Sequence, residues 1–215
     1  MVSNLLNIEN MNSIDKNELK TQLEKFNISN LSKDYIFLLG LKKSGVLDGK
    51  FSMLSFNTKD SKNISVGECG SVGCLIGWIT TNNKLNFDNF VTRYKQINKK
   101  DSTTPYYQWS CNRYNLKDTN IIIWEYLFSA LWEYTKTSQL NIGKLNGSDE
   151  VLTFQLKKLK LFISEHKKLM NNEPSILIEQ ILLIKKLVIP RKSYTHDNVK
   201  LFLGSLIKQI DDVIL

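Results

Sequence analysis

The middle of the chain reads Ile121-Ile122-Ile123-Trp124-Glu125-Tyr126-Leu127-Phe128-Ser129-Ala130-Leu131-Trp132. Bulky apolar side chains recur in it at the i, i+3, i+4 and i+7 spacing that places residues on one helix face; they are Trp124, Leu127, Phe128 and Leu131. The surrounding segment, residues 116–134, is also strongly apolar and aromatic. The pattern predicts a helix in the core of the protein.

Helical spacing extends from this segment toward the N-terminus. Residues 13–26 predict a first helix, with Ser13 as its cap. We expect a second helix to begin after Ser32 and to end at Gly45, since glycine readily adopts the left-handed conformation that ends helices. Residues 71–81 and 87–97 predict two more helices. The short, partly alternating segment 51–56 is expected to be extended.

Toward the C-terminus, a polar loop at residues 135–147 is the best internal boundary. Three helices are predicted beyond it: one after the cap Ser148, one between Ser175 and Pro190, and one after Thr195. The chain has only three prolines and ten glycines, which favours long helices. We therefore predict an all-α, compact multi-helix fold. It comprises a helical core domain at residues 1–140 and a C-terminal helical subdomain at 148–215, packed together as one folded unit.

The composition is that of an ordinary globular protein, with 215 residues of which 42% are apolar and 23% charged. Three cysteines are too few for a disulfide framework and odd in number, and residues 1–12 lack a signal-peptide pattern. No apolar run reaches the length that spans a membrane. We therefore expect a cytoplasmic protein that does not contact a membrane, and the oligomeric state stays open.

The sequence between residues 66 and 78 has the most distinctive local pattern. Ser71 is a good N-cap, and Gly73 and Gly77 share one face of the helix that follows. A face without side chains lets a second helix approach closely, so we interpret the segment as a packing motif. Its residues are Cys69, Gly70, Ser71, Gly73, Cys74, Gly77 and Trp78.

This segment resembles a family of small bacteriophage and prophage proteins. That family carries Phe-x-Met, then Cys-Gly-Ser/Thr-x-x-Cys-x-x-Gly-Trp, then Leu-Phe-x-x-x-Trp; here these motifs begin at Phe51, Cys69 and Leu127. The histidine that often precedes the family's first cysteine is absent from this chain. The resemblance implies a phage or prophage setting, in the host cytoplasm or in the virion, and transfers no activity.

Three sharper interpretations of the same segment compete with packing. A zinc site at Cys69 and Cys74 lacks further ligands close in sequence, because the histidines are His166 and His196. A reactive thiol would be favoured at a helix N-terminus but needs a base from elsewhere in the fold. An anion or nucleotide could bind the helix start at Gly70–Gly73, although the spacing matches no phosphate-binding loop. We expect no metal, no cofactor and no catalytic residue.

The formal net charge is +8, and the last 65 residues contribute a net +5, with 11 Lys and Arg against 6 Asp and Glu. Such an excess favours nucleic acid or another acidic partner, but lysines on solvated helix faces give the same pattern. The predicted basic surface comprises Lys157, Lys158, Lys160, Lys167, Lys168, Lys185, Lys186, Arg191 and Lys192.

Without a catalytic constellation, the sequence favours a non-enzymatic accessory protein that binds another protein. Such a protein could modulate a host system or be a minor virion component. Two alternatives stay open: a basic nucleic-acid-associated protein, and a small-molecule or nucleotide binder at the Gly70–Gly73 helix start.

Overall fold

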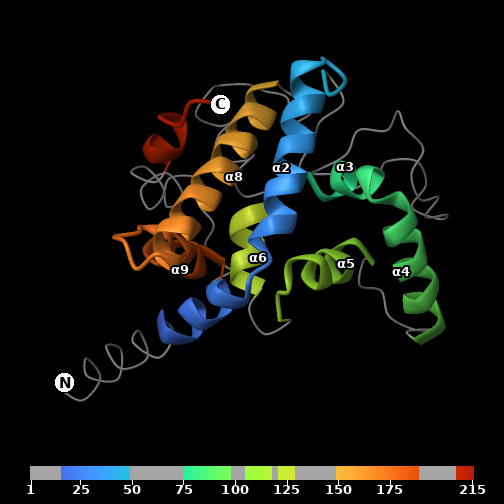
Figure 1. Cartoon of the computed structure of the whole chain (residues 1–215), viewed down its shortest axis with the longest axis horizontal. Coiled ribbons are helices and arrows are strands. Elements are labelled where there is room, and N and C mark those ends of the chain that lie inside the picture. The colour runs from blue at the N-terminus through green and yellow to red at the C-terminus, as the bar shows by residue number, and fades with distance from the viewer. Residues whose placement is uncertain (1–15, 49–74, 98–104, 118–120, 129–148, 189–206) are drawn as a thin grey trace.

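The computed structural model of the protein describes residues 16–48, 75–97, 105–117, 121–128, 149–188 and 207–215 (Figure 1). Every regular element within these ranges is an α-helix, and none is a strand. The predicted all-α fold class is therefore confirmed. The predicted extended segment at residues 51–56 lies outside the described residues.

The labelled helices range from 8 residues in α3 and α6 to 22 residues in α8. They are α2 (Ile28–Lys43), α3 (Leu75–Asn82), α4 (Lys84–Ile97), α5 (Pro105–Tyr114), α6 (Ile121–Phe128), α8 (Asp149–Met170) and α9 (Leu177–Val188). Residues 16–25 and 207–211 are also helical.

Helix α2 lies in the middle of the molecule (Figure 1). It packs against α8 on one side and against α3 and α5 on the other. Helix α4 contacts α3 and α5, while α9 contacts α6 and α8. The described helices do not test where one predicted domain ends, because residues 129–148 lie outside them.

Stacked aromatic rings form the centre of the core. The ring of Phe26 stacks on Tyr114 at 5.8 Å between centroids, and Tyr114 stacks on Phe128 at 5.4 Å. The ring of Phe162 in α8 also contacts that of Phe26, in an edge-on arrangement at 5.2 Å between centroids. Because these residues come from distant parts of the sequence, burial of their rings joins the helices at residues 16–25, α5, α6 and α8.

The prediction that the second helix starts after Ser32 is wrong, because α2 begins at Ile28. Asn27 is the cap, and its side-chain oxygen accepts a hydrogen bond from the backbone N–H of Asn30 at 3.0 Å. Ser32 lies inside the helix, where its hydroxyl donates to the carbonyl of Ile28.

The predicted end of this helix at Gly45 agrees with the structure. Gly45 has a φ of +72°, and its N–H donates to the Lys42 carbonyl at 3.0 Å. The N–H of Val46 reaches back to the carbonyl of Leu41 at 3.1 Å. These two bonds form the Schellman arrangement that satisfies the last carbonyls of a helix.

Helix α5 was not predicted from the sequence. It begins with Pro105, whose fixed φ and missing N–H suit the first position of a helix. Leu116, the first residue of the apolar segment 116–134, follows α5 directly, and its N–H donates to the Cys111 carbonyl at 2.8 Å. The described part of the following helix, α6, starts at Ile121.

Candidate binding groove

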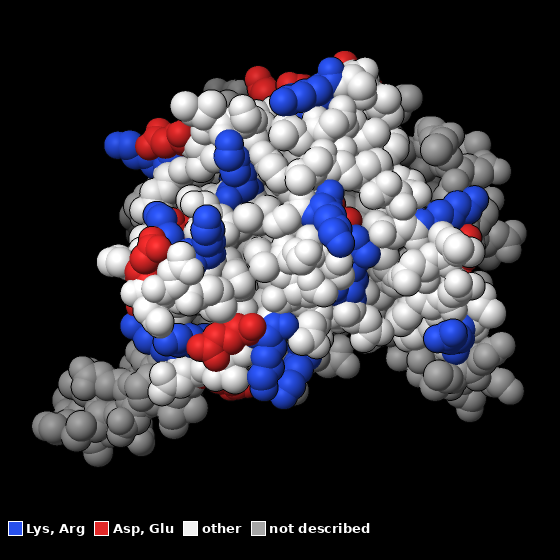
Figure 2. Space-filling model, viewed as in Figure 1, with Lys and Arg blue, Asp and Glu red and all other residues white. Residues whose placement is uncertain are grey.

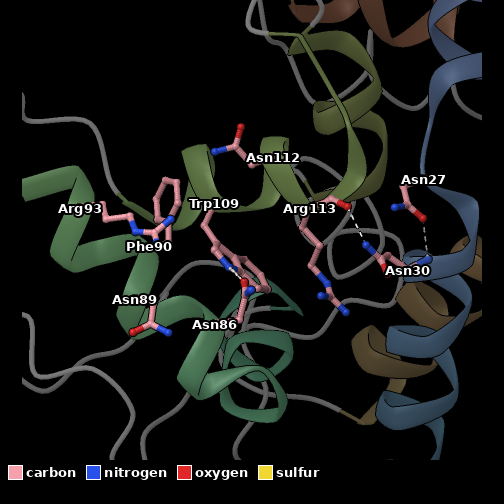
Figure 3. Close-up of a pocket in the computed structure, with 9 residues that line it drawn as sticks. All are labelled: Asn27, Asn30, Asn86, Asn89, Phe90, Arg93, Trp109, Asn112 and Arg113. Atoms are coloured by element: carbon pink, nitrogen blue, oxygen red, sulfur yellow. Dashed lines mark hydrogen bonds between the residues drawn. The ribbon is translucent and has the colours of Figure 1, made fainter. Parts of the chain in front are cut away.

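One face of α4 and one face of α5 border a groove of about 450 Å³ (Figure 3). Its residues follow helical spacing: Asn86, Asn89, Phe90 and Arg93 on α4, and Trp109, Asn112 and Arg113 on α5. The start of α2 closes the groove with Asn27 and Asn30. Five of the nine described residues that line it are asparagines, so uncharged carboxamides dominate this part of its surface.

Burial of the neighbouring face of α4 holds the two helices together. Phe87, which is fully buried, lies 4.7 Å from Tyr106 and 5.5 Å from Trp109 between ring centroids. Val91, one turn further along α4, is also buried. Because residues 86, 89 and 90 flank this apolar stripe, packing Phe87 against α5 directs the polar face of α4 toward the groove.

Trp109 forms the floor of the groove and is only 2% exposed. Its indole N–H donates to the side-chain oxygen of Asn86 at 2.9 Å. The guanidinium of Arg113 lies 5.3 Å from the centre of its ring. The N–H of the indole and one of its faces are therefore already used inside the protein.

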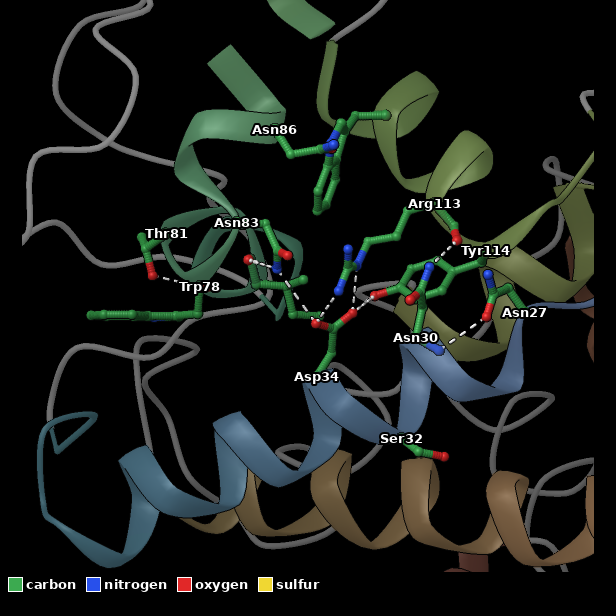
Figure 4. Close-up of polar contacts among 12 residues, drawn as sticks. Asn27, Asn30, Ser32, Asp34, Trp78, Thr81, Asn83, Asn86, Arg113 and Tyr114 are labelled. Atoms are coloured by element: carbon green, nitrogen blue, oxygen red, sulfur yellow. Dashed lines mark hydrogen bonds and ion pairs between the residues drawn. The ribbon is translucent and has the colours of Figure 1, made fainter. Parts of the chain in front are cut away.

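A buried carboxylate lies beneath the groove (Figure 4). Asp34 of α2 is 0% exposed, and it accepts hydrogen bonds from Nε and Nη2 of Arg113, both at 2.7 Å. The Tyr114 hydroxyl donates to the same carboxylate at 2.8 Å. The side-chain amide nitrogen of Asn83 donates a longer hydrogen bond to it, at 3.5 Å. This network ties α2 to α5 and to the junction of α3 and α4.

The network shifts the pKa values of its two residues on α5, Arg113 and Tyr114. Burial, and then the charge of Asp34, raises the pKa of Tyr114 well above its usual value. For Arg113, burial opposes the charged form, but the hydrogen bonds and charge of Asp34 outweigh it and raise the pKa. Tyr114 therefore stays neutral and Arg113 stays charged at physiological pH, so the pair is a fixed structural element.

The start of α2 is joined to the end of α5 by further hydrogen bonds. The Asn27 N–H donates to the Tyr114 carbonyl at 2.9 Å, and the Asn30 amide donates to the Arg113 carbonyl at 2.9 Å. The side-chain oxygen of Asn27 serves as the cap of α2. These asparagines form a rigid end wall.

Three polar side chains of the groove are exposed and unengaged. Asn89, Arg93 and Asn112 make no side-chain hydrogen bond or ion pair with any residue that the structure describes. No Asp or Glu is among the described residues that line the groove. Since Asp34 neutralises Arg113, Arg93 is the one arginine of this described lining without an acidic partner among the described residues. Within the described part of the chain, the groove thus offers two unengaged carboxamides and one unengaged guanidinium.

Comparison with known proteins gives no relative from which a role could be transferred. The chain matches no protein-family model, no curated protein and no solved structure.

The predicted packing motif is only partly described. Cys69, Gly70, Ser71, Gly73 and Cys74 lie outside the described residues. Gly77 and Trp78 lie in α3, where Trp78 is buried and the Gly77 carbonyl accepts a hydrogen bond from the Thr80 hydroxyl at 2.6 Å. Close helix packing at these glycines therefore stays a prediction.

The predicted basic surface is only partly described, and one of its described lysines is buried. Lys158 is 0% exposed, which corrects its assignment to that surface, and burial lowers its pKa well below the usual value although the charge of Glu125 opposes this. Lys157 donates to the Asp211 carbonyl and Lys160 to the Ile214 carbonyl, near the C-terminal end of the last helical segment.

The other cations of that set are paired, exposed or not described. Lys168 pairs with Glu165 at 2.7 Å, and Lys167 is exposed. Arg191 and Lys192 lie outside the described residues, as do the side chains of Lys185 and Lys186, which belong to α9. Figure 2 shows Lys and Arg dispersed over the visible face, with Asp and Glu between them at several points.

The sulfur and imidazole groups that are described have structural surroundings. Cys111 is buried in α5. His166 is buried in α8, with Nε2 2.7 Å from the Leu23 carbonyl, and its ring stacks on Phe162. Within the described ranges no three His, Cys, Asp or Glu residues gather as metal ligands. Every helix in these ranges is too short or too polar to cross a membrane.

Proposed function

We propose that this chain is a non-enzymatic accessory protein of phage or prophage type that acts by binding another protein. The observation that carries the proposal is the groove, where Asn89, Arg93 and Asn112 are exposed and make no side-chain hydrogen bond or ion pair with another described residue. Carboxamides and a guanidinium donate and accept hydrogen bonds but are poor nucleophiles and poor proton-transfer groups near neutral pH. The phage setting rests on the resemblance of the motifs beginning at Phe51, Cys69 and Leu127.

Hydrogen bonds and ring packing hold the helices that border the groove together, which favours binding of a partner protein. The Asp34 network and the end wall at Asn27 and Asn30 join α2 to α5, and the packing of Phe87 joins α4 to α5. A site held by such contacts loses little conformational entropy on binding.

The experiment is an affinity capture from bacterial cells that express the tagged full chain, after nuclease treatment and at physiological salt, followed by crosslinking and mass spectrometry. We expect a defined protein to be crosslinked to the chain. Recovery of nucleic acid alone, or turnover of a substrate that is lost in Cys69→Ser or Cys74→Ser, would contradict the proposal.

A further inference from the structure

We infer that the groove between α4, α5 and the start of α2 binds an extended peptide segment that carries one carboxylate. The inference rests on the proposed function and names the chemistry of the partner's contact region. It follows from three properties of the described lining: two amides without a described partner, the charge, and aromatic rings that are buried or already packed.

The amides match the main chain of a peptide. Each carboxamide offers two N–H donors and one oxygen acceptor. An extended peptide outside a sheet presents an N–H and a C=O at every residue, and these need partners when it is covered. Asn89 lies on α4 and Asn112 on α5, so the groove offers carboxamides from both of its helices (Figure 3). Each can bond a peptide unit in both directions.

The charge selects a carboxylate. The described part of the lining contains Arg93 and Arg113 but no acidic residue. The buried Asp34 beneath the groove neutralises Arg113 through two hydrogen bonds of 2.7 Å. Arg93, exposed on α4, is left with five N–H donors and no acidic partner among the described residues. Guanidinium and carboxylate groups pair through two parallel hydrogen bonds, so one carboxylate complements this groove.

The floor disfavours a single-stranded nucleic acid. Such ligands are held by successive aromatic side chains and by a track of cations along the backbone. Trp109 is 2% exposed, and its N–H and one face are taken by Asn86 and Arg113. Phe90 is half-buried and already stacks on Tyr94 at 5.8 Å. One uncompensated arginine does not make a phosphate track.

The volume of the groove limits the length of the peptide segment that it can hold. A cavity of about 450 Å³ lies within the range of about 300–1,000 Å³ that is usual for ligand sites. It accommodates a few residues of an extended chain and no folded element. We therefore place a short linear segment of the partner here, and a larger interface would surround it.

The test uses a phage-displayed library of random linear peptides, selected on the full-length protein, and synthetic copies of the enriched peptides measured by fluorescence polarisation. We expect enriched peptides to share a carboxylate. The double variant Asn89→Ala/Asn112→Ala should weaken their binding by about tenfold or more, since it removes several hydrogen bonds. Asn82→Ala, an exposed asparagine on α3 outside the groove, is the matched control and should bind as the parent does.

A double-mutant cycle, in which the peptide's acidic side chain and Arg93 are changed separately and together, tests the role of the carboxylate. Replacing the peptide's acidic side chain by its amide should weaken binding to the parent protein but have little further effect in Arg93→Ala. A peptide with an amidated C-terminus separates a side-chain carboxylate from a terminal one. Lys84→Ala, which removes another exposed cation of α4, is the control for Arg93→Ala and should leave this coupling intact.

Several results would overturn the inference. They are failure to enrich any peptide, equal binding by the parent and the double variant, and displacement of bound peptide by a mixed-sequence single-stranded oligonucleotide. If a captured protein partner still binds the double variant as tightly as the parent, the groove assignment fails while the proposed function stands. If peptides bind the groove but no protein is crosslinked in cells, the proposed function fails alone.

Discussion

Asp34 is a single residue on which three segments of the protein depend. It is fully buried and receives hydrogen bonds from Arg113 and Tyr114. Asp34→Ala would leave the mostly buried guanidinium of Arg113 uncompensated, so we expect a loss of about 3–5 kcal/mol in unfolding free energy. Tyr114→Phe, which removes one bond to a charged group, should cost less, about 1.5–3 kcal/mol. Urea denaturation measures both.

Two further variants test whether the uncompensated charge of Arg113 causes the loss of stability in Asp34→Ala. Lys16→Ala breaks an ion pair with Glu179 whose side chains are both well exposed, so the expected loss is below about 1 kcal/mol. Arg113→Met added to Asp34→Ala should restore part of the stability, because it removes the uncompensated charge. If this second change gives no recovery, the stabilisation does not come from the charge balance.

His166 gives the protein a pH dependence of known sign. Burial lowers its pKa below the usual 6.5, and the hydrogen bond to the Leu23 carbonyl opposes this only in part. The unfolded chain therefore binds more protons than the folded one in the window below pH 6.5. Unfolding free energy should fall as the pH drops from 6.5 to the lowered pKa, and then the contribution of His166 should level off.

His166→Gln tests this assignment, since its amide can donate to the same carbonyl and does not titrate. Chemical denaturation at a series of pH values should show a shallower decline for the variant in the window just below pH 6.5. An unchanged slope would mean that another group titrates there.

At the scale of elements, two helices end on asparagine in a left-handed conformation. Asn115 after α5 and Asn172 after α8 both have a φ of 56°. Asn172→Gly should leave stability unchanged or raise it slightly, whereas Asn172→Ala should lower it by roughly 1 kcal/mol, because a Cβ disfavours this conformation. Thermal denaturation compares them, and equal stability of the Ala and Gly variants would contradict the prediction.

Asn115 provides the matched comparison. Its amide also donates to the Lys25 carbonyl at 2.8 Å, at the end of the helix of residues 16–25. Asn115→Gly relieves the same backbone conformation but loses this bond, which is typically worth about 0.5–1.5 kcal/mol. We therefore expect Asn115→Gly to be less stable than Asn172→Gly relative to the parent.

Helices with clear apolar periodicity were predictable, and helices defined by polar residues were not. Acidic residues 149 and 150 after a capping serine predict α8, and Asp149 indeed begins it. The N-cap Asn27 was overlooked in favour of Ser32, since serine and asparagine both cap helices in general and the sequence does not distinguish them. Helix α5 was missed because its composition is largely polar, although Tyr106, Trp109 and Tyr114 bury their rings.

The groove, too, could be predicted from the sequence only in part. Asn86, Asn89 and Arg93 follow helical spacing and could have been grouped from the sequence. Their pairing with Asn112 depends on the position of α5, a helix that has no clear apolar periodicity. Lys158 illustrates the converse: lysine is typical of a solvated face, but this lysine lies one turn from Phe154 and one turn from Phe162, on the buried face of α8. Local patterns predict the faces of a helix, whereas tertiary packing determines which faces are covered.

For the whole molecule, a formal charge of +8 predicts only weak, nonspecific attraction to nucleic acid. Lys158 is buried, and Lys157 and Lys160 donate to carbonyls at the C-terminal end of the chain. In gel shifts with a mixed-sequence single-stranded oligonucleotide, retention at low salt should therefore disappear by physiological ionic strength of about 0.15 M.

Charge reversals on two different helices distinguish a nonspecific attraction from a built site. Lys33→Glu on α2 and Lys167→Glu on α8 both change an exposed lysine. If the attraction arises from net charge, each should reduce retention at low salt to the same extent, because each removes the same charge from the molecule. A much larger effect of Lys167→Glu, or retention that survives physiological salt, would instead mean that the basic C-terminal third contacts phosphates directly.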